Sequence, residues 1–460
     1  MTSPLATALA ERVTALARTP LTPALRARAL DLLRDHVAVT IGGAVEESSR
    51  VLRAGVAALG DAGDGTVVGT RERLPPASAA LANGAAAHAL EMDDTHCGGS
   101  IHLGSSVFPA ALAAAELTSA TGDGVLRAAV AGYEVGARLA MALGPAAHYR
   151  RGFHPTGTCG AFAAATAAGV VFGFDAATLA RALGIAGSQA SGAMEFLADG
   201  TWTKRLHPGW AAHAGLHAAA LARAGFLAPA TILEGRAGFL ASYSDAADPT
   251  LVLAPGEPEL LRTSVKPHAC CRYMQGPIDV ALALRDAHGV RPDDVARVEV
   301  GMLAASWAIV CEPSEQKRRP RCVVDAQFSL PFGVAVALAR GVASPAEFAD
   351  ATFADPVVTA LMDRVVAVRD AALDAEYPRA WPAWVRVTHR DGRVLEGRVT
   401  HPLGDPENFP STAALDAKLE TLAGRVLGPP ALRSLRAALA DFASAPDARA
   451  LLAATVPTVR

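Results

Sequence analysis

The feature that most constrains the fold of this chain is a series of Ala- and Gly-rich apolar segments in its first half. The most apolar of them covers residues 159–174 and reads CGAFAAATAAGVVFGF. It is shorter than the about 20 residues that a membrane-spanning helix needs, so we interpret it as a buried core helix and expect no membrane association. Ala has the highest helix propensity, and its small side chain lets neighbouring helices approach closely. We therefore predict a tightly packed, all-helical domain.

Further helical patterns in the first half are joined by short Gly, Pro and Asp turns. Thr22 and Pro23 supply a helix start, and Gly42-Gly43 supplies its end. Apolar spacing predicts helices over residues 23–43, 48–59, 76–88, 108–118, 123–143, 154–174, 176–183 and 211–227.

The pattern changes near residues 253–256, where strands begin to alternate with helices. We expect strands over 297–302 and 365–369, a hairpin over 384–400 that turns at Asp391-Gly392, helices over 275–288 and 331–340, and a helical C-terminus. The predicted fold is mostly α. A large all-helical domain is built from both chain ends, residues 1–256 and 403–460, and a smaller α/β lid domain is inserted over 257–402. The cleft between two such domains is the expected ligand site.

Composition excludes several classes of partner. The formal net charge of −3 provides no field that would favour nucleic acid or an anionic membrane. The N-terminus shows no basic region followed by an apolar core, so we expect no signal peptide. The six Cys have no CxxC spacing, which favours reduced thiols in a cytoplasmic protein and no zinc site.

Residues 83–109, NGAAAHALEMDDTHCGGSIHLGSSVFP, concentrate the titratable side chains of an otherwise apolar region. Acids and imidazoles beside a flexible Gly/Ser loop suit proton-transfer chemistry. The alternative is a capped helix end with structural histidines. Eight of the 13 His fall between His88 and His217, and this concentration in one domain favours an acid/base site.

Three further clusters combine His, Lys and Arg. YRRGFHPTG, with His154, precedes the core helix, where free amides attract anions; TWTKRLHPG carries Lys204 and Arg205; SVKPHACCRYMQ carries Lys266 and Arg272. Each cluster has a structural alternative. The first could be an Arg-rich surface loop. In the second, the following His213 and His217 favour helix packing over a metal pair, and in the third, Cys270-Cys271 could be a buried pair rather than hold a nucleophile.

Five ordered motifs resemble those of the MmgE/PrpD family over nearly the whole chain. They read LEMDDTH…IHLGSS, GFHPTGTCGAF, TWTKRLHPGWAAHAG, SVKPHACCRYMQ and DAQFSLPF. The family includes 2-methylcitrate dehydratase, cis-aconitate decarboxylase and iminodisuccinate epimerase. The resemblance implies a helical domain with an inserted α/β lid, usually in a homodimer, and no need for a metal or an organic cofactor.

The resemblance also assigns residues. His102 corresponds to the family's His after DDT, His154 to the His of its GxHP motif, and Lys204 to the Lys of its TKxLH motif. This chain departs from the family pattern at three positions. Glu91 stands where decarboxylase-like members have Asp, Gln275 where many members have His, and Phe332 where a Tyr is expected. The last two changes remove an imidazole and a phenol that could donate protons.

The shared chemistry of such enzymes is removal of a proton alpha to a carboxylate, which requires a general base and cations near the carboxylate oxygens. We predict catalytic roles for His102, His154, Lys204, Glu91, Asp94 and Thr95, and substrate binding by Arg205, Lys266, Arg272, Gln275 and His96.

The functional prediction is a cofactor-independent, dehydratase-like lyase that acts on a small di- or tricarboxylic acid. The first alternative is an epimerase or isomerase of a dicarboxylate, which would deprotonate and then reprotonate its substrate. The second is a non-catalytic homologue that binds a metabolite.

Overall fold

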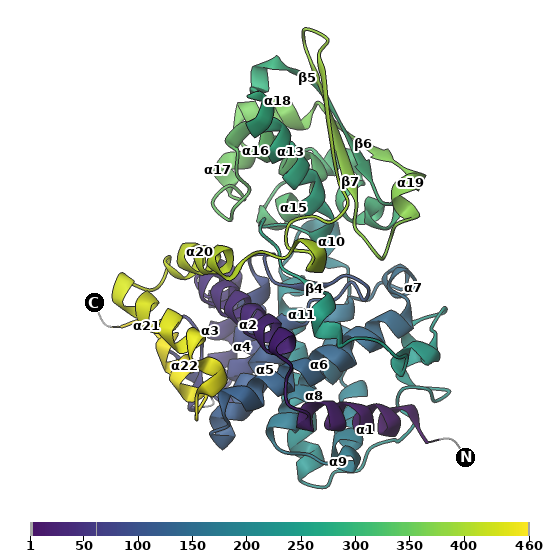
Figure 1. Ribbon diagram of the computed structural model, residues 1–460, viewed down its shortest axis with the longest axis vertical. Helices are drawn as coiled ribbons and strands as arrows, with labels where there is room; N and C mark the ends of the chain where they lie inside the picture. The colour runs from purple at the N-terminus through teal and green to yellow at the C-terminus, as the bar shows by residue number, and fades with distance from the viewer. Residues whose placement is uncertain (1–2, 61, 459–460) are drawn as a thin grey trace.

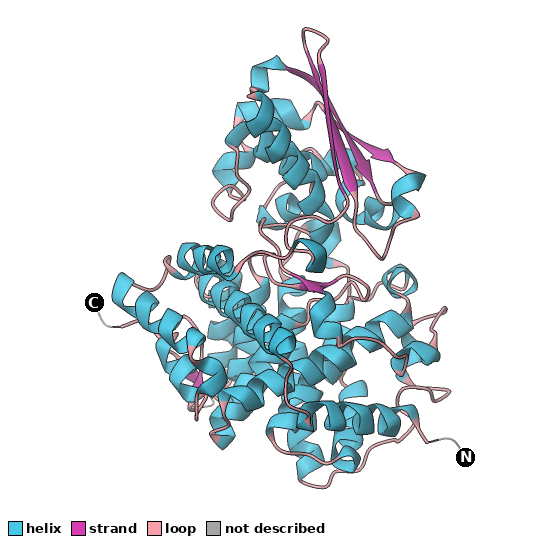
Figure 2. Cartoon of the chain, in the orientation of Figure 1, coloured by secondary structure: helices cyan, strands magenta, loops and turns pink. Residues whose placement is uncertain are grey.

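The computed structural model describes residues 3–60 and 62–458, and it confirms the mostly α fold class. A broad helical body lies at the bottom of Figure 1, and a narrower part that carries the main sheet stands above it. We use "lid" for this upper part, from helix α13 to strand β8, and "body" for the remainder. Figure 2 shows that the strands of the larger sheet are confined to the lid.

The body contains the helices of both chain ends. They are α1 (Leu5–Arg18), α2 (Pro23–Gly43), α3 (Glu47–Ala57), α4 (Pro76–His88), α5 (Gly104–Thr118), α6 (Gly122–Leu143), α7 (Pro145–Arg150), α8 (Pro155–Val171), α9 (Ala176–Gly187), α10 (Phe196–Asp199), α11 (Thr203–Arg223), α12 (Phe239–Tyr243), α20 (Thr412–Ala423), α21 (Pro429–Ala440) and α22 (Arg449–Ala454). Two short strand pairs, β1 (Gly65–Thr66) with β2 (Arg73–Leu74) and β3 (Thr95–His96) with β4 (Thr263–Ser264), are antiparallel.

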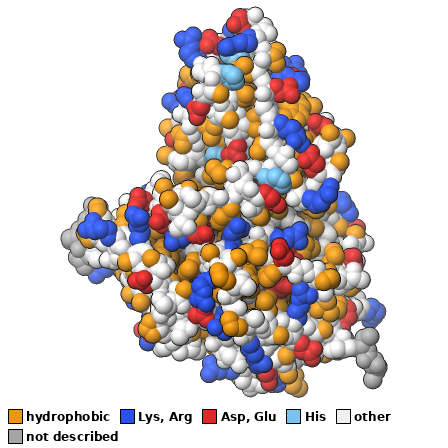
Figure 3. Space-filling view, in the orientation of Figure 1, with side chains coloured by type: hydrophobic (Ala, Val, Ile, Leu, Met, Phe, Trp, Pro, Cys, Tyr) orange, Lys and Arg blue, Asp and Glu red, His pale blue; other side chains and the backbone are white. Residues whose placement is uncertain are grey.

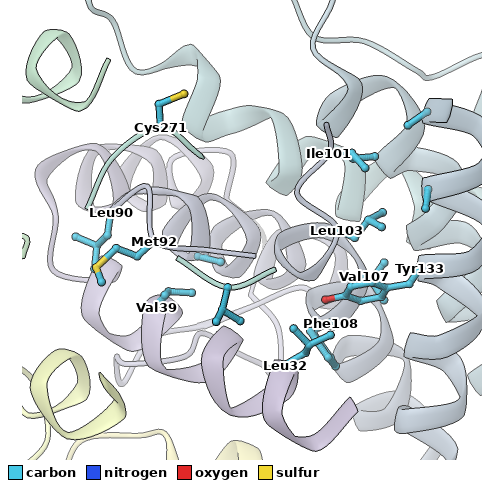
Figure 4. Packing of buried hydrophobic residues seen from close by; sticks show 14 of the residues in the cluster. Leu32, Val39, Leu90, Met92, Ile101, Leu103, Val107, Phe108, Tyr133 and Cys271 are labelled. Atoms are coloured by element: carbon cyan, nitrogen blue, oxygen red, sulfur yellow. The ribbon is translucent and has the colours of Figure 1, made fainter. Parts of the chain in front are cut away.

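Helix α8, the Ala/Gly-rich segment, lies at the centre of the body and packs against α5, α6 and α11. Small residues make these contacts possible. A side chain at Gly209 would place its Cβ 2.2 Å from the backbone oxygen of Leu81, so only Gly lets α11 approach α4 this closely. The apolar core extends beneath the site. In Figure 4, Val107, Phe108 and Tyr133 lie in one buried cluster with residues of α2.

The lid is a mixed sheet covered by helices. Its strands are β5 (Val295–Met302), β6 (Val365–Arg369), β7 (Ala383–His389) and β8 (Val394–Val399), in the order β6-β5-β7-β8 with β5 and β6 parallel. Its helices are α13 (Gln275–His288), α14 (Ser314–Lys317), α15 (Val323–Gln327), α16 (Leu330–Arg340), α17 (Asp350–Phe353), α18 (Pro356–Met362) and α19 (Ala371–Asp374). Strand β7 alternates buried and half-buried residues because one face packs on the lid core.

Most of the expected elements are present, several boundaries differ by a few residues, and the largest difference is at the start of α11. We expected the eleventh helix to begin at residue 211, after the Pro208-Gly209 pair. Instead, α11 begins at Thr203 and contains Pro208. Pro lacks the amide hydrogen that continues a helix, which is why the pattern indicated a break. Close packing of α11 on α4 and α8 maintains the helix through that position.

The C-terminal helices return to the body, where α20 packs against α2 and α22 contacts α5. The division at residues 256 and 402 stays a prediction. Among the described residues, no helix combines the length and apolar character needed to cross a membrane. Lys, Arg, Asp and Glu are intermingled over the face in Figure 3, as a net charge of −3 suggests.

Candidate active site

A small polar cavity lies where the lid meets the body. Its volume is about 30 Å³, which is enough to hold a water molecule. Residues from both parts of the chain line it: Glu91, Thr95, Ser100, His102, Tyr149, His154, Met194 and Lys204 from the body, and Cys271, Arg272, Tyr273, Ile309, Phe328 and Trp381 from the lid and the segment that enters it. The expected position of the site, between the two parts, agrees with this geometry.

Three buried imidazoles gather beside the cavity. His88 ends α4, His102 lies in the loop before α5, and His154 caps the N-terminus of α8. Their ring centroids are 4.8 Å apart for His88 and His102, 5.9 Å for His88 and His154, and 6.0 Å for His102 and His154. The Gly/Ser loop places His102 against α8, because the His102 amide donates to Thr156 Oγ1 at 3.1 Å.

Hydrogen bonds fix which nitrogens of His88 and His102 carry protons. His102 Nδ1 lies 2.7 Å from the carbonyl oxygen of Asp94, which can only accept, so Nδ1 carries the hydrogen and Nε2 keeps a lone pair. His88 Nδ1 donates in the same way to Asp93 at 2.6 Å. Among the described residues, Nε2 of His102 and Nε2 of His154 have no protein partner. Both are therefore available to a bound molecule.

His154 has a different partner, a second histidine. Its Nδ1 lies 3.0 Å from Nδ1 of His207 in α11, so one of the two rings must donate and the other accept. Either ring can hold that proton. The Nε2 of His154 can thus carry a lone pair or a hydrogen, which is what a group that alternates between base and acid requires.

A quartet of buried charges lies directly beneath the imidazoles. The Lys204 ammonium contacts Glu91 Oε1 and lies 2.8 Å from His88 Nε2. Lys266 Nζ lies 3.4 Å from Glu91 Oε2 and 3.2 Å from Asp93 Oδ1. The β3–β4 pairing brings Lys266 here, because Thr95 pairs with Ser264 two residues before it. Two carboxylates and two ammonium groups balance to zero formal charge.

Burial and these partners shift the pKa of each group. Burial lowers the pKa of His102 and His154 well below the usual value, so both are neutral near pH 7. Burial alone would raise the pKa of Glu91, but Lys204 and Lys266 hold it below its usual range. The pKa of Lys204 is lowered, chiefly by burial, with Glu91 opposing the change. Because Lys204 contacts two acceptors, we treat it as the ammonium form.

Arg272 supplies a cation that is only partly satisfied. One Nη2 contact goes to Asp405, while Nε and Nη1 are buried without a hydrogen-bond partner among the described residues. The guanidinium carbon lies 5.3 Å from the centroid of the Trp381 ring. Unpartnered donors of a buried guanidinium at a cavity wall are suited to a bound carboxylate.

Of the adjacent acids, Asp93 faces the imidazoles and Asp94 does not. Asp94 accepts from the Tyr133 hydroxyl and from the Gly104 amide, at 2.9 Å for the latter. Burial raises the pKa of Asp94 to about 7. The Asp94 side chain, which we predicted to be catalytic, therefore does not line the cavity. Its backbone carbonyl orients His102, and the Asp93 carboxylate makes the contact with His88.

Three predicted substrate-binding residues, Arg205, Gln275 and His96, do not line the cavity, and neither does Phe332, one of the departures from the family pattern. Arg205 donates to Ser48 and Gln327 on the far side of α11. Gln275 bonds the backbone of His268 and Cys270 and so supports the loop before Arg272. His96 lies 3.1 Å from Glu259. Phe332 packs on Phe348 and Phe353 in the lid core, so its lack of a hydroxyl removes no donor from the site.

The sequence reasoning missed several groups that the structure places here. His88 and Asp93 were not among the predicted site residues, and His207 was not singled out. A signal existed for His207, because residues three apart on a helix share a face and His207 follows Lys204 by three. Glu91 carries a further mark of the site: its φ of 54° is rare for a residue other than Gly.

The three imidazoles are also the described residues best placed to hold a metal ion. One donor atom of each of His88, His102 and His154 lies within 4.8 Å of the others. The Lys204 ammonium already provides a cation next to His88 Nε2. Cys271 is a poor thiolate ligand or nucleophile, because burial raises the pKa of its thiol.

Comparison with known proteins gives consistent matches. Residues 7–252 match the MmgE/PrpD N-terminal domain, and residues 268–441 match the MmgE/PrpD C-terminal domain. A cis-aconitate decarboxylase of Aspergillus terreus is 28% identical over 422 residues, which are 87% of this chain and 85% of that protein. A cis-aconitate decarboxylase-like protein, oryM, of Aspergillus oryzae is 28% identical over 454 residues, 93% of this chain and 92% of that protein. Human cis-aconitate decarboxylase is 36% identical over 177 residues, 38% of this chain and 36% of that protein.

Proposed function

The chain belongs to the MmgE/PrpD family, and from that premise we propose that it is a lyase acting on a small di- or tricarboxylic acid in the cavity between body and lid. The observation that carries the proposal is the pairing of two imidazoles that have free Nε2 atoms with cationic side chains at the same wall. The imidazoles are His102 and His154, and the cations are Lys204 and Arg272. Carbanion chemistry next to a carboxylate requires a neutral base together with nearby cations.

Two reactions share that chemistry. In a decarboxylation, the bond from carbon to the departing carboxylate breaks, CO2 leaves, and the electron pair left on carbon takes a proton that an imidazole nitrogen delivers and that solvent then replaces. In a dehydration, an imidazole Nε2 takes the proton alpha to a carboxylate, the carbon–oxygen bond breaks, and hydroxide leaves as water after protonation. Both reactions place negative charge beside a carboxylate, where a nearby ammonium or guanidinium lowers the barrier.

We assign His102 as a base because its tautomer leaves the lone pair on Nε2. His154 exchanges the proton on the other side, since its bond to His207 permits either tautomer. Lys204 stabilises developing charge on the substrate, with Glu91 holding its position, and the free donors of Arg272 bind a second carboxylate. Thr95 Oγ1, 3.2 Å from His102 Nδ1, helps to orient that ring. No metal or organic cofactor enters this scheme.

The first test is a panel of acids incubated with the protein in deuterated water. Cis-aconitate comes first because of two relatives that match over most of their length. One is named a cis-aconitate decarboxylase, and the other a cis-aconitate decarboxylase-like protein. Release of CO2 with deuterium in the product supports a decarboxylase, and formation of an alkene from citrate or 2-methylcitrate supports a dehydratase. No change in any of these acids, or in a broader set of di- and tricarboxylates, contradicts the proposal.

The second test uses variants. His102→Gln, His154→Gln and Lys204→Met should each lower turnover by at least ~100-fold. The matched control is His213→Gln with His217→Gln, a pair on the outer face of α11 that should retain activity. A loss below threefold would remove the substituted residue from the mechanism.

An epimerase is the second candidate, and one observation favours it. His102 and His154 have ring centroids 6.0 Å apart, and both line the cavity. Two bases could therefore remove a proton on one side of a carbon and return it on the other. Deuterium exchange into iminodisuccinate without alkene or CO2 would select this activity over the lyase.

We retain two further proposals from the resemblance. One is the division of the chain into a helical domain of residues 1–256 and 403–460 and a lid domain of 257–402. The other is a homodimer. Sedimentation of the purified protein at micromolar concentration should give twice the mass of the chain, and a monomer at that concentration would overturn the second proposal.

A further inference from the structure

The three-histidine cluster has a property that the proposed reaction does not use. We propose that His88, His102 and His154 form a site for a first-row divalent cation that prefers imidazole nitrogen, such as Zn²⁺, and that the bound ion displaces Lys204 and blocks the cavity. The ion acts as an inhibitor and not as a cofactor. Its binding is independent of the proposed function, and only the inhibition rests on it.

The geometry of the donors carries the first step. The donor atoms of the three rings lie within 4.8 Å of one another. In a tetrahedral site with zinc–nitrogen bonds of about 2.0 Å, ligand nitrogens lie about 3.3 Å apart, so the rings must close by up to about 1.5 Å. Three protein nitrogens leave a fourth coordination position open, and two of the three rings, His102 and His154, line the cavity.

The second step concerns the hydrogen bond that the Nδ1 atom of each ring makes on the side away from the cluster. His88 Nδ1 donates to Asp93, His102 Nδ1 donates to the Asp94 carbonyl, and His154 Nδ1 shares a proton with His207. Metal-binding histidines usually have this arrangement, in which an outer acceptor fixes the tautomer and the orientation of the ring. His88 and His102 have it, and the bond between His154 and His207 permits the same tautomer for His154. In that tautomer each ring keeps the lone pair on Nε2.

Lys204 is the competitor. Its ammonium lies 2.8 Å from His88 Nε2, where the same lone pair would have to serve the metal. Glu91 Oε1 contacts that ammonium and lies 3.9 Å from His88 Nε2. Replacing Lys204 with a neutral side chain frees His88 Nε2 and leaves the Glu91 carboxylate without one of its cations. Both effects favour a divalent ion.

The experiment is a titration of the full chain with Co²⁺, followed by the visible absorption of tetrahedral cobalt, and then displacement by Zn²⁺ in a calorimeter. We expect one ion per chain in the wild type. His102→Gln and His154→Gln should each weaken binding at least tenfold. Lys204→Met should strengthen binding at least tenfold while it abolishes turnover. Lys204→Met should therefore raise the affinity for the ion and lower turnover, so this one substitution tests the metal site and the proposed function separately.

The chain offers a matched control for nonspecific binding. His213 and His217 form a partly exposed pair one turn apart on α11, with ring centroids 4.5 Å apart. Replacing both with Gln should leave the cobalt spectrum unchanged. A spectrum lost in that double variant but kept in His102→Gln would overturn the proposal. So would the absence of bound cobalt in both the wild type and Lys204→Met, measured on folded samples verified by circular dichroism.

Discussion

The buried charge quartet under the histidines makes a quantitative prediction about stability. Glu91, with a side chain 2% exposed, contacts two lysines that are themselves buried. At 3.4 Å from Lys266 Nζ, an effective dielectric constant of 20 gives an attraction of about 5 kcal/mol before the cost of desolvation. Glu91→Gln leaves this charge set with an excess positive charge. We expect a loss of about 3–5 kcal/mol in the free energy of unfolding.

A second substitution should restore part of that loss. Lys204→Met alone leaves an excess negative charge, and we expect a similar cost. The double variant removes one charge of each sign and keeps the Lys266–Asp93 pair at 3.2 Å. It should therefore be more stable than the sum of the single effects predicts, by about 2–3 kcal/mol. Turnover should stay abolished, because Lys204 is absent.

The assay is urea unfolding at pH 7, followed by circular dichroism, for the wild type and the three variants. The matched control is the surface pair of Arg386 and Glu396, 2.7 Å apart and 41% and 52% exposed. The same cycle there should give a coupling below about 1 kcal/mol. Strict additivity of Glu91→Gln and Lys204→Met would refute the view that these charges neutralise each other.

Three further predictions follow from individual contacts. Burial lowers the pKa of His36 to about 3. Below pH 6.5 the unfolded chain therefore binds a proton at His36 that the native chain does not bind, and the protein loses stability as the pH falls. Replacing His36 with Gln should reduce the loss in the free energy of unfolding between pH 7 and pH 5 by about 2 kcal/mol. The opposite sign applies to Asp94, because its pKa is raised to about 7 and its contribution to stability is lost as the pH rises. Between pH 5 and pH 8, the free energy of unfolding of Asp94→Asn should increase by about 2 kcal/mol relative to that of the wild type. No relative increase would show that this carboxyl titrates normally. Arg272→Met should raise KM for a carboxylate substrate at least tenfold, because it removes the unpartnered donors at the cavity. Arg205→Met loses only contacts to Ser48 and Gln327, so it should change KM less than threefold. Equal effects of the two substitutions would contradict the positions of these side chains.

The elements with local signals were predictable from the sequence. Thr22 caps α2 through its side chain, as expected, and α4, α13 and β6 have the predicted bounds. The starts of α2 and α4 are set by residues within one turn, a capping hydroxyl in α2 and a Pro at the first position in both. The start of α11 was missed because its continuation through Pro208 depends on neighbouring helices.

Within the site, the residue types were predictable but the directions of the side chains were not always. Adjacent residues on a helix point about 100° apart, so Lys204 and Arg205 cannot both face the cavity. That inference was accessible only with the correct start of α11. Asp93 and Asp94 lie in an irregular connection, where no periodicity indicates which carboxylate turns inward. Their roles follow from contacts with Lys266 and Tyr133, which are distant in sequence.

The small volume of the cavity has a consequence for the pace of the reaction. A space of about 30 Å³ is far below the 300 Å³ or more of common ligand pockets, and its wall is shared by the body and the lid. A molecule with two or three carboxylates is larger than this space, so the proposed reaction requires those two walls to separate. Under that proposal each cycle includes a mechanical step, and solvent viscosity should slow turnover even where the chemistry is unchanged.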